Sequence, residues 1–175
     1  MSGPVQHAGN AGRRQLLRRI AALGVAAGSV AGGALRTGAA RASAAALPAS
    51  HSLAQELALA QKLRQPLVVM VSLHGCPFCE VVRSSHLAPM LRREGLPVVQ
   101  VDMRSKAMTE DFAGQPVSHD QLVRQWNARV APTVLFFGQG AKEVAERLEG
   151  GYLPDFYGSY LDDRLLAARQ RIRKT

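Results

Sequence analysis

From residue 67 the chain reads Leu67-Val68-Val69-Met70-Val71-Ser72-Leu73, followed by His74-Gly75-Cys76-Pro77-Phe78-Cys79. The first run is continuous, apolar and rich in β-branched residues, which is typical of a central strand covered on both faces. Gly75 ends the strand, and Pro77 suits the first turn of a helix, because that turn offers no partner for a backbone N–H. This stretch therefore predicts a buried strand, a tight turn and a helix that begins at Cys76.

The two cysteines of this stretch are the only ones in the chain. At the start of a helix, the sulfur of Cys76 would face free backbone N–H groups and the positive end of the helix dipole. Both lower a thiol pKa from about 8.5 to between about 3.5 and 7.5. Cys79 lies one helical turn further in, close enough to form a disulfide with Cys76. The spacing favours dithiol–disulfide chemistry, in which Cys76 attacks and Cys79 resolves the mixed disulfide.

A Cys-x-x-Cys pair has other uses, and the sequence alone leaves them open. Half of a zinc site is one, since His74 and His86 could supply further ligands. A haem attachment site would need a histidine at position 80, where Glu80 stands instead. A purely structural disulfide this short would constrain almost nothing in the unfolded chain. A strand before the pair and a helix after it favour the redox interpretation.

Helices and strands alternate on either side of the pair. A capping box of Ser52 and Gln55 opens an amphipathic helix over residues 52–64. Beyond the cysteines we expect a helix that Pro89 breaks near Ala88, with a second helical segment that ends at Glu94. The next elements expected are a strand over 96–103, a polar irregular stretch over 104–117 and a helix over 118–128. They are followed by a strand over 133–137, a turn over 138–140, a strand over 144–148 and a helix from Tyr157 to Ile172. This order predicts an α/β domain in which helices flank both faces of a central mixed β-sheet.

A second motif stands before the apolar strand at 133–137. It reads Val130-Ala131-Pro132-Thr133. Proline at the entry of a strand donates nothing to the hydrogen-bond ladder, so it is either a turn proline or a cis proline that turns neighbouring backbone groups toward a ligand.

Together these features resemble thioredoxin, over roughly residues 50–172. The strand, the Cys-x-x-Cys helix, the Pro-Thr strand entry, the glycine-containing hairpin and the terminal helix occur in that order. The resemblance implies that Cys76 is the nucleophile, that Cys79 is the resolving thiol and that Pro132 is a cis proline beside the disulfide. It also implies that the backbone of Ala131 pairs with an extended substrate, and that Pro77 and Phe78 contact the substrate.

The sequence departs from thioredoxin at three places. The pair between the cysteines is Pro77-Phe78, closer to glutaredoxin than to the Gly-Pro of thioredoxin. Met70 stands where thioredoxin carries a buried acid, so the proton of Cys79 must leave by another route, for which Glu80 and His74 are candidates. The stretch 104–117 is longer than the usual connection.

Residues 1–44 have the features of an export signal. They contain six arginines and no acid, and the run Gly12-Arg13-Arg14-Gln15-Leu16-Leu17-Arg18 resembles a twin-arginine signal. A weakly apolar stretch follows, and Ala42-Ser43-Ala44 offers a cleavage site before Ala45. The alternative is an uncleaved membrane anchor, although the apolar stretch is short of the roughly 20 residues that span a bilayer. We therefore expect a periplasmic protein with a flexible lead-in over 45–51 and the folded domain over 52–175.

The charge distribution argues against nucleic acid as a partner. The net charge is +9, but beyond residue 44 only 16 basic residues face all 13 acidic ones, so the excess lies mainly in the leader. We expect a monomeric enzyme that exchanges thiols and disulfides with protein substrates, uses no cofactor beyond its own disulfide, and is served by a membrane or periplasmic redox partner. The rival classes are a copper- or zinc-binding module and a non-catalytic partner domain on the same scaffold.

Overall fold

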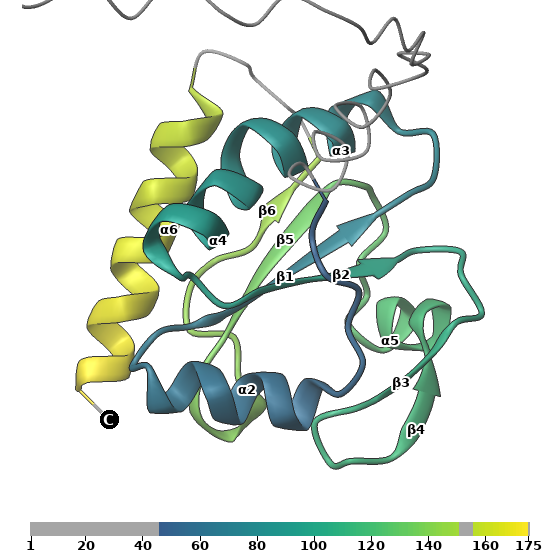
Figure 1. Ribbon diagram of the computed structural model, residues 1–175, viewed down its shortest axis with the longest axis horizontal. Helices are drawn as coiled ribbons and strands as arrows, with labels where there is room; N and C mark the ends of the chain where they lie inside the picture. Colours follow the sequence, from purple (N-terminus) through teal and green to yellow (C-terminus); the bar gives the residue numbers. More distant parts are fainter. Residues whose placement is uncertain (1–45, 151–155, 175) are drawn as a thin grey trace, which may run out of the picture. The chain divides into compact units, whose positions relative to one another are not determined.

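The computed structural model describes residues 46–150 and 156–174 (Figure 1). The predicted export signal over 1–44, its cleavage site and Ala45 lie outside these residues. No helix within the described ranges is both long enough and apolar enough to cross a membrane.

A four-stranded sheet forms the centre of the domain. Its strands are β1 (Leu67–Ser72), β2 (Val98–Asp102), β5 (Thr133–Phe137) and β6 (Leu148–Glu149), in the spatial order β2-β1-β5-β6. β1 runs parallel to β2 and antiparallel to β5, and β5 runs antiparallel to β6. The mixed α/β sheet is confirmed, and the strand predicted over 133–137 has those bounds.

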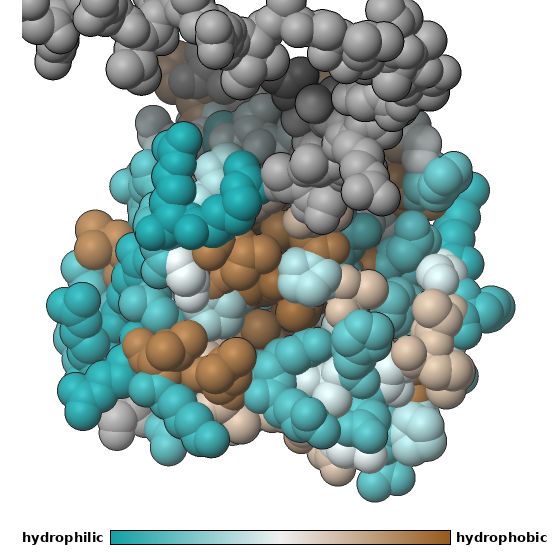
Figure 2. Space-filling view, in the orientation of Figure 1, coloured by the Kyte–Doolittle hydropathy of each residue, from teal (hydrophilic) through white to brown (hydrophobic). Residues whose placement is uncertain are grey.

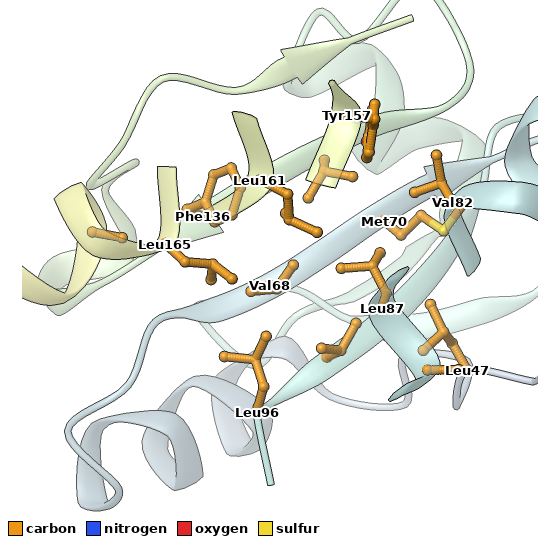
Figure 3. Packing of buried hydrophobic residues seen from close by; sticks show 14 of the residues in the cluster. Leu47, Val68, Met70, Val82, Leu87, Leu96, Phe136, Tyr157, Leu161 and Leu165 are labelled. Carbon is orange, nitrogen blue, oxygen red and sulfur yellow. The ribbon is translucent and has the colours of Figure 1, made fainter. Parts of the chain in front are cut away.

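Side chains of β1 alternate between two hydrophobic cores, one on each face of the sheet. Val68 and Met70 lie in the core of what we call the first face, which also contains Phe136, Leu161 and Cys79 (Figure 3). Leu67, Val69 and Val71 lie in the core of the second face. Every residue of β1 is buried, as expected for a strand covered on both faces.

Four helical segments cover the first face: α3 (Pro77–Val81), η1 (Val82–Leu87), α4 (Ala88–Glu94) and α6 (Tyr157–Arg173). The predicted break near Ala88 is wrong, because the backbone stays helical through this point. η1 is a π-helix, and the Ala88 N–H donates to the carbonyl of Arg83, five residues earlier. The wider π turn carries the chain past Pro89, which has no N–H to donate. Gly95, at φ 65°, ends α4 as predicted.

The second face is covered by α2 (Leu53–Lys62) and α5 (His119–Gln125). Ser52 caps α2 by accepting a hydrogen bond from the Gln55 N–H, as the sequence predicts. A second capping box, of Ser118 and Gln121, opens α5. In Figure 2 apolar surface shows between α4 and α2, with hydrophilic side chains around it. Leu59 of α2 and Leu63, the residue that caps its C-terminus, are exposed large apolar residues.

The stretch 104–117 contains a hairpin, so the prediction of an irregular stretch is wrong. β3 (Met108–Glu110) pairs antiparallel with β4 (Pro116–Ser118) in a separate two-stranded sheet. Gly114, at φ 76°, takes part in the turn between them. Each strand has only three residues and one begins with proline, so neither shows the alternating pattern of a longer strand.

Residues 46–52, which we call the strap, are held by hydrogen bonds, which corrects the prediction of a flexible lead-in. The Ser50 N–H donates to the Gln100 carbonyl at 2.9 Å, and the Gln100 N–H donates to the Pro48 carbonyl at 2.8 Å. The strap thus pairs with the outer edge of β2, and the side chain of Leu47 enters the core of the first face. Pairing the free edge of a sheet in this way protects it from association with other chains.

The partner of β5 is shorter than predicted. A strand was expected over 144–148, whereas β6 spans only Leu148–Glu149. Nearer the turn, the Val144 N–H donates to the Phe136 carbonyl, and Glu143 forms an isolated bridge with Phe137. The chain therefore pairs with β5 at two separate places. A short 3-10 turn, η2 (Gln139–Ala141), stands where the turn was predicted.

Candidate active site

Cys76 lies at the start of α3, as the sequence predicts. Gly75 adopts φ 72° in the turn after β1, and Cys76 is the N-cap residue with an extended backbone. The Cys76 Sγ accepts a hydrogen bond from the Cys79 N–H at 3.1 Å. This is the contact that an N-terminal helix N–H makes with an anion, so the same geometry stabilises a thiolate at Cys76.

Cys76 and Cys79 form a disulfide, and their Cα atoms are 5.2 Å apart. The two sulfurs differ in access, because Cys79 is 0% exposed while Cys76 is only partly buried. An external sulfur can therefore approach Cys76 and not Cys79. Cys79 packs in the core of the first face with Met70 and Val134.

The second predicted motif lies beside the disulfide. The peptide bond between Ala131 and Pro132 is cis, as the resemblance implied. The Ala131 carbonyl oxygen is 3.8 Å from the Cys76 Sγ. Pro132 is buried, and its carbonyl accepts from the Gly150 N–H at 2.8 Å. The start of β5 is thus held against the start of α3.

Pro77 and Phe78, the two residues between the cysteines, are exposed. The side chain of Phe78 is 54% exposed. Both are therefore accessible at the rim of the disulfide. The structure thus brings together the six residues predicted for catalysis or substrate binding: Cys76, Pro77, Phe78, Cys79, Ala131 and Pro132.

Glu80 was a candidate for taking the proton of Cys79, and it is engaged elsewhere. Its carboxylate forms an ion pair with Arg83 on the outer side of the helix, where the Glu80 side chain is 58% exposed. The Nε–H of Arg83 in turn donates to the Gln100 side chain of β2 at 2.7 Å. The other candidate, His74, is exposed in the turn.

His86, which had no partner in the sequence, lies on η1 against α6. Its ring stacks on Tyr157 with centroids 5.3 Å apart. Burial lowers the pKa of His86, and the nearby charge of Asp162 opposes the shift. The neutral ring is therefore favoured, and it serves the packing of α6.

No role was predicted for Ser72 from the sequence, and the structure shows it to be unusual. It is the last residue of β1 and is only 1% exposed, yet its hydroxyl has no hydrogen-bond partner among the described residues. Sequence reasoning missed it because a serine at the end of an apolar run looks like the end of a strand. Its position four residues before Cys76 is the only signal that could have found it.

A metal site requires several ligands around one point. Within residues 46–150 and 156–174, no three histidine, cysteine, aspartate or glutamate side chains are grouped so that they could hold a metal ion. His74 and His86, which the zinc alternative would need as further ligands, do not form such a group with the cysteines.

Fold and site together define a class: an α/β protein with a Cys-x-x-Cys disulfide at a helix start, next to a cis proline. The sequence from residue 53 to residue 164 matches the family model of the thioredoxin-like domain. The chain belongs to this family and has a thioredoxin-like fold. No curated protein sequence matches the chain.

Several solved structures are similar to this chain at low sequence identity. A protein described as DsbH oxidoreductase is 20% identical, with a TM-score of 0.49, covering 70% of this chain and 88% of its own. Mitochondrial thioredoxin 3 of Saccharomyces cerevisiae, in its oxidised form, is 14% identical, with a TM-score of 0.48, covering 71% of this chain and 97% of its own. A thioredoxin of Thermus thermophilus is 20% identical, with a TM-score of 0.45, covering 71% of this chain and 87% of its own.

Proposed function

We propose that this protein is an exported thiol–disulfide oxidoreductase, which exchanges disulfides with thiols of other proteins through Cys76 and Cys79. The observation that carries the proposal is the disulfide at the start of α3, with one sulfur accessible and the other buried. Membership of the thioredoxin-like family supports a role of this kind.

In the oxidising direction, a substrate thiolate attacks the Cys76 Sγ. The bond to Cys79 breaks, a mixed disulfide forms, and Cys79 leaves as a thiolate. A second substrate thiolate then attacks the substrate sulfur of the mixed disulfide, which releases Cys76 as a thiolate. The substrate becomes a disulfide, and two electrons pass to the protein. Each thiolate takes up a proton from water according to its pKa.

In the reducing direction the same steps run backward. The Cys76 thiolate attacks a substrate disulfide, and Cys79 then attacks the Cys76 Sγ and releases the reduced substrate. The Cys79 N–H, 3.1 Å from the Cys76 Sγ, supports the thiolate in both directions. The chemistry needs no cofactor beyond the disulfide itself.

A pair of variants tests the chemistry. Cys76→Ser abolishes turnover of a model protein disulfide, because the accessible nucleophile is lost. Cys79→Ser keeps the nucleophile and loses the resolving thiol, so it accumulates a mixed disulfide visible on a non-reducing gel. Stoichiometric copper or zinc in the purified unmodified protein, without turnover, would support the metal-binding alternative. If the unmodified protein showed no turnover and bound no metal, that result would support a non-catalytic module.

The leader supports a location outside the cytoplasm, where disulfides persist. Replacing Arg13 and Arg14 together by lysine keeps the positive charge and removes the twin-arginine pattern. If the twin-arginine route is used, the full-length chain then stays in the cytoplasmic fraction of a bacterial host. Continued export would point to the general route, and no export of the unmodified chain would contradict the proposed location.

The direction of exchange depends on the reduction potential, which equilibration with glutathione measures. A low reduction potential, near that of thioredoxin, favours a reductase whose disulfide is reduced again by a membrane or periplasmic electron donor. A higher, more oxidising potential favours disulfide formation in substrates.

A further inference from the structure

Ser72 is a buried polar residue that takes no part in the thiol–disulfide exchange steps proposed above. Its side chain is 1% exposed, and its Oγ has no partner among the described residues. The other buried serine and threonine hydroxyls of the described chain are hydrogen-bonded, namely those of Ser50, Ser52, Thr109, Ser118 and Thr133. Since native proteins satisfy nearly all buried hydroxyls, this exception calls for a reason.

Ser72 lies on the same face of the sheet as Cys79. Side chains alternate along β1, and Val68 and Met70 enter the core of the first face, so Ser72 is directed to that face as well. Cys79 belongs to the same core, and Met70 lies next to Val82, three residues after Cys79 (Figure 3). The hydroxyl and the buried sulfur therefore share one side of the sheet.

They also share one end of it. Val71 pairs with Thr133, so Ser72 stands at the level of Pro132, the residue beside the disulfide. Four residues after Ser72 the chain reaches Cys76 and begins α3. A hydroxyl without a partner is thus buried at the very end of the sheet where the sulfurs react.

We propose that the Ser72 hydroxyl donates a hydrogen bond to the sulfur of Cys79 when the disulfide is reduced, and so stabilises the Cys79 thiolate. This inference rests on the proposed function. In the oxidised protein the Cys79 sulfur is uncharged and is a weak acceptor. A thiolate at the same place is a strong acceptor, because hydrogen bonds to charged groups are about twice as strong as neutral ones.

The consequence is a bias toward the dithiol form. The hydroxyl is unsatisfied in the disulfide form and satisfied in the reduced form, so it favours reduction of the protein and makes it a stronger oxidant. It also provides stabilisation at a site where Met70 occupies the position of the family's buried acid. No net proton is transferred to Ser72; the proton of Cys79 passes to water.

Charged groups on the surrounding elements must be considered, because they also act on a thiolate. The elements that form the core around Cys79 carry many titratable groups besides the cysteines: Glu80, Arg83, His86, Arg92, Arg93, Glu94, Asp102, Tyr157, Tyr160, Asp162, Asp163, Arg164, Arg169, Arg171 and Arg173. Glu80 and Arg83 pair with each other, and Asp102 accepts from the Arg104 N–H at 2.9 Å. Ser72→Ala leaves all of them in place, so the comparison isolates the hydroxyl.

The test is the thiol–disulfide equilibrium of Ser72→Ala with glutathione. We expect a shift of about tenfold toward the disulfide, which for a two-electron couple lowers the reduction potential by about 30 mV. In a Cys76→Ala background, the same substitution raises the pKa of Cys79, followed by thiolate absorbance in the ultraviolet. An unchanged equilibrium or an unchanged Cys79 pKa would overturn the inference.

Ser50→Ala is the matched control. Ser50, on the strap, is also 1% exposed, but its hydroxyl forms hydrogen bonds with Glu56 of α2 and Thr109 of β3. We expect this control to lower the thermal midpoint and to leave the glutathione equilibrium unchanged. Ser72→Ala should shift the glutathione equilibrium without lowering the thermal midpoint of the oxidised protein, because the Ser72 hydroxyl has no hydrogen bond to lose there.

The two proposals can fail separately. If the unmodified protein does not exchange with glutathione at all, the proposed function is wrong. If the unmodified protein exchanges with glutathione and Ser72→Ala has the same exchange equilibrium, the proposed function stands and the proposed role of Ser72 is wrong.

Discussion

The two faces of the sheet bury polar groups in different ways. Next to the second face, the strap, the β3–β4 hairpin and the start of α5 hold a network in which each buried side chain has a partner. His119 shows this best, because its Nδ1 accepts from the Asp102 N–H and its Nε2 lies 3.4 Å from the Ser50 carbonyl. On the first face, the disulfide lies in an apolar core, and the nearby Ser72 hydroxyl is unsatisfied.

The difference separates structural polar groups from reactive ones. A satisfied network fixes one arrangement of backbone segments that have little apolar periodicity of their own. An unsatisfied group beside a redox pair costs stability in one state and gains a partner in the other. Substitutions on the two sides should therefore divide into those that change stability and those that change exchange.

The largest effects on stability should come from the two cores, which β5 connects. Phe136 lies in the first core and its neighbour Leu135 in the second, and both are 0% exposed. We expect Phe136→Ala to lower the free energy of unfolding by about 3–5 kcal/mol and Leu135→Ala by about 2–5 kcal/mol. Urea denaturation should show a single transition in both variants. Two transitions in either would mean that the faces unfold independently.

The strap offers the next largest effect. The Glu56 carboxylate accepts from the Ser50 hydroxyl at 2.8 Å and from the His51 N–H at 2.9 Å. Glu56→Ala leaves both donors without this acceptor, so we expect a loss of about 2 kcal/mol in the free energy of unfolding. Glu56→Gln retains an acceptor oxygen and should lose less. Disulfide exchange should be unchanged in both; a slower exchange would contradict the division between the two sides.

Asp120 should give a smaller effect, confined to acid pH. Hydrogen bonds from Lys106, Ser118 and Arg124 hold the pKa of Asp120 well below its usual range. Its charged form therefore stabilises the fold at any pH above the unfolded pKa of about 3.9, and this stabilisation is lost as the pH falls toward the folded pKa. At pH values below about 4 the thermal midpoint should decrease as the pH falls, and Asp120→Asn should flatten that part of the pH profile. An equally steep profile in the variant would exclude Asp120 as the cause.

Strong local patterns made the centre of the fold predictable. β1 is a continuous apolar run and α6 repeats apolar residues at helical spacing, so both were found close to their observed bounds. Cys76 and Cys79 were found from their spacing and from the helix signal of Pro77. The cis geometry of Pro132 followed from the resemblance to thioredoxin and from nothing local.

What the sequence did not predict depends on contacts between distant segments. Residues 108–110 become a strand because they pair with residues 116–118 and pack near α2. The strap is ordered by the edge of β2, through Gln100, which lies about 50 residues further along the chain. The missing partner of Ser72 is likewise visible only once the surrounding side chains are placed.

Phe78 should give the smallest effect on stability, although it lies next to both cysteines. Its side chain is 54% exposed, so we expect Phe78→Ala to change the free energy of unfolding by less than about 0.5 kcal/mol. An exposed aromatic ring at the rim of the disulfide can instead bury apolar surface of a protein substrate, and its loss should lower kcat/KM for such a substrate by about tenfold. Exchange with glutathione, too small to cover the ring, should keep its rate.

Leu166 on α6 is the matched control, because it is 56% exposed and lies outside the segments that form the site. Leu166→Ala should change neither stability nor exchange with either substrate. An equal loss of kcat/KM for the protein and for glutathione in Phe78→Ala would mean that the ring acts on the sulfurs rather than on the substrate. The exposed ring would then belong with Ser72 among the groups that adjust the chemistry of the first face.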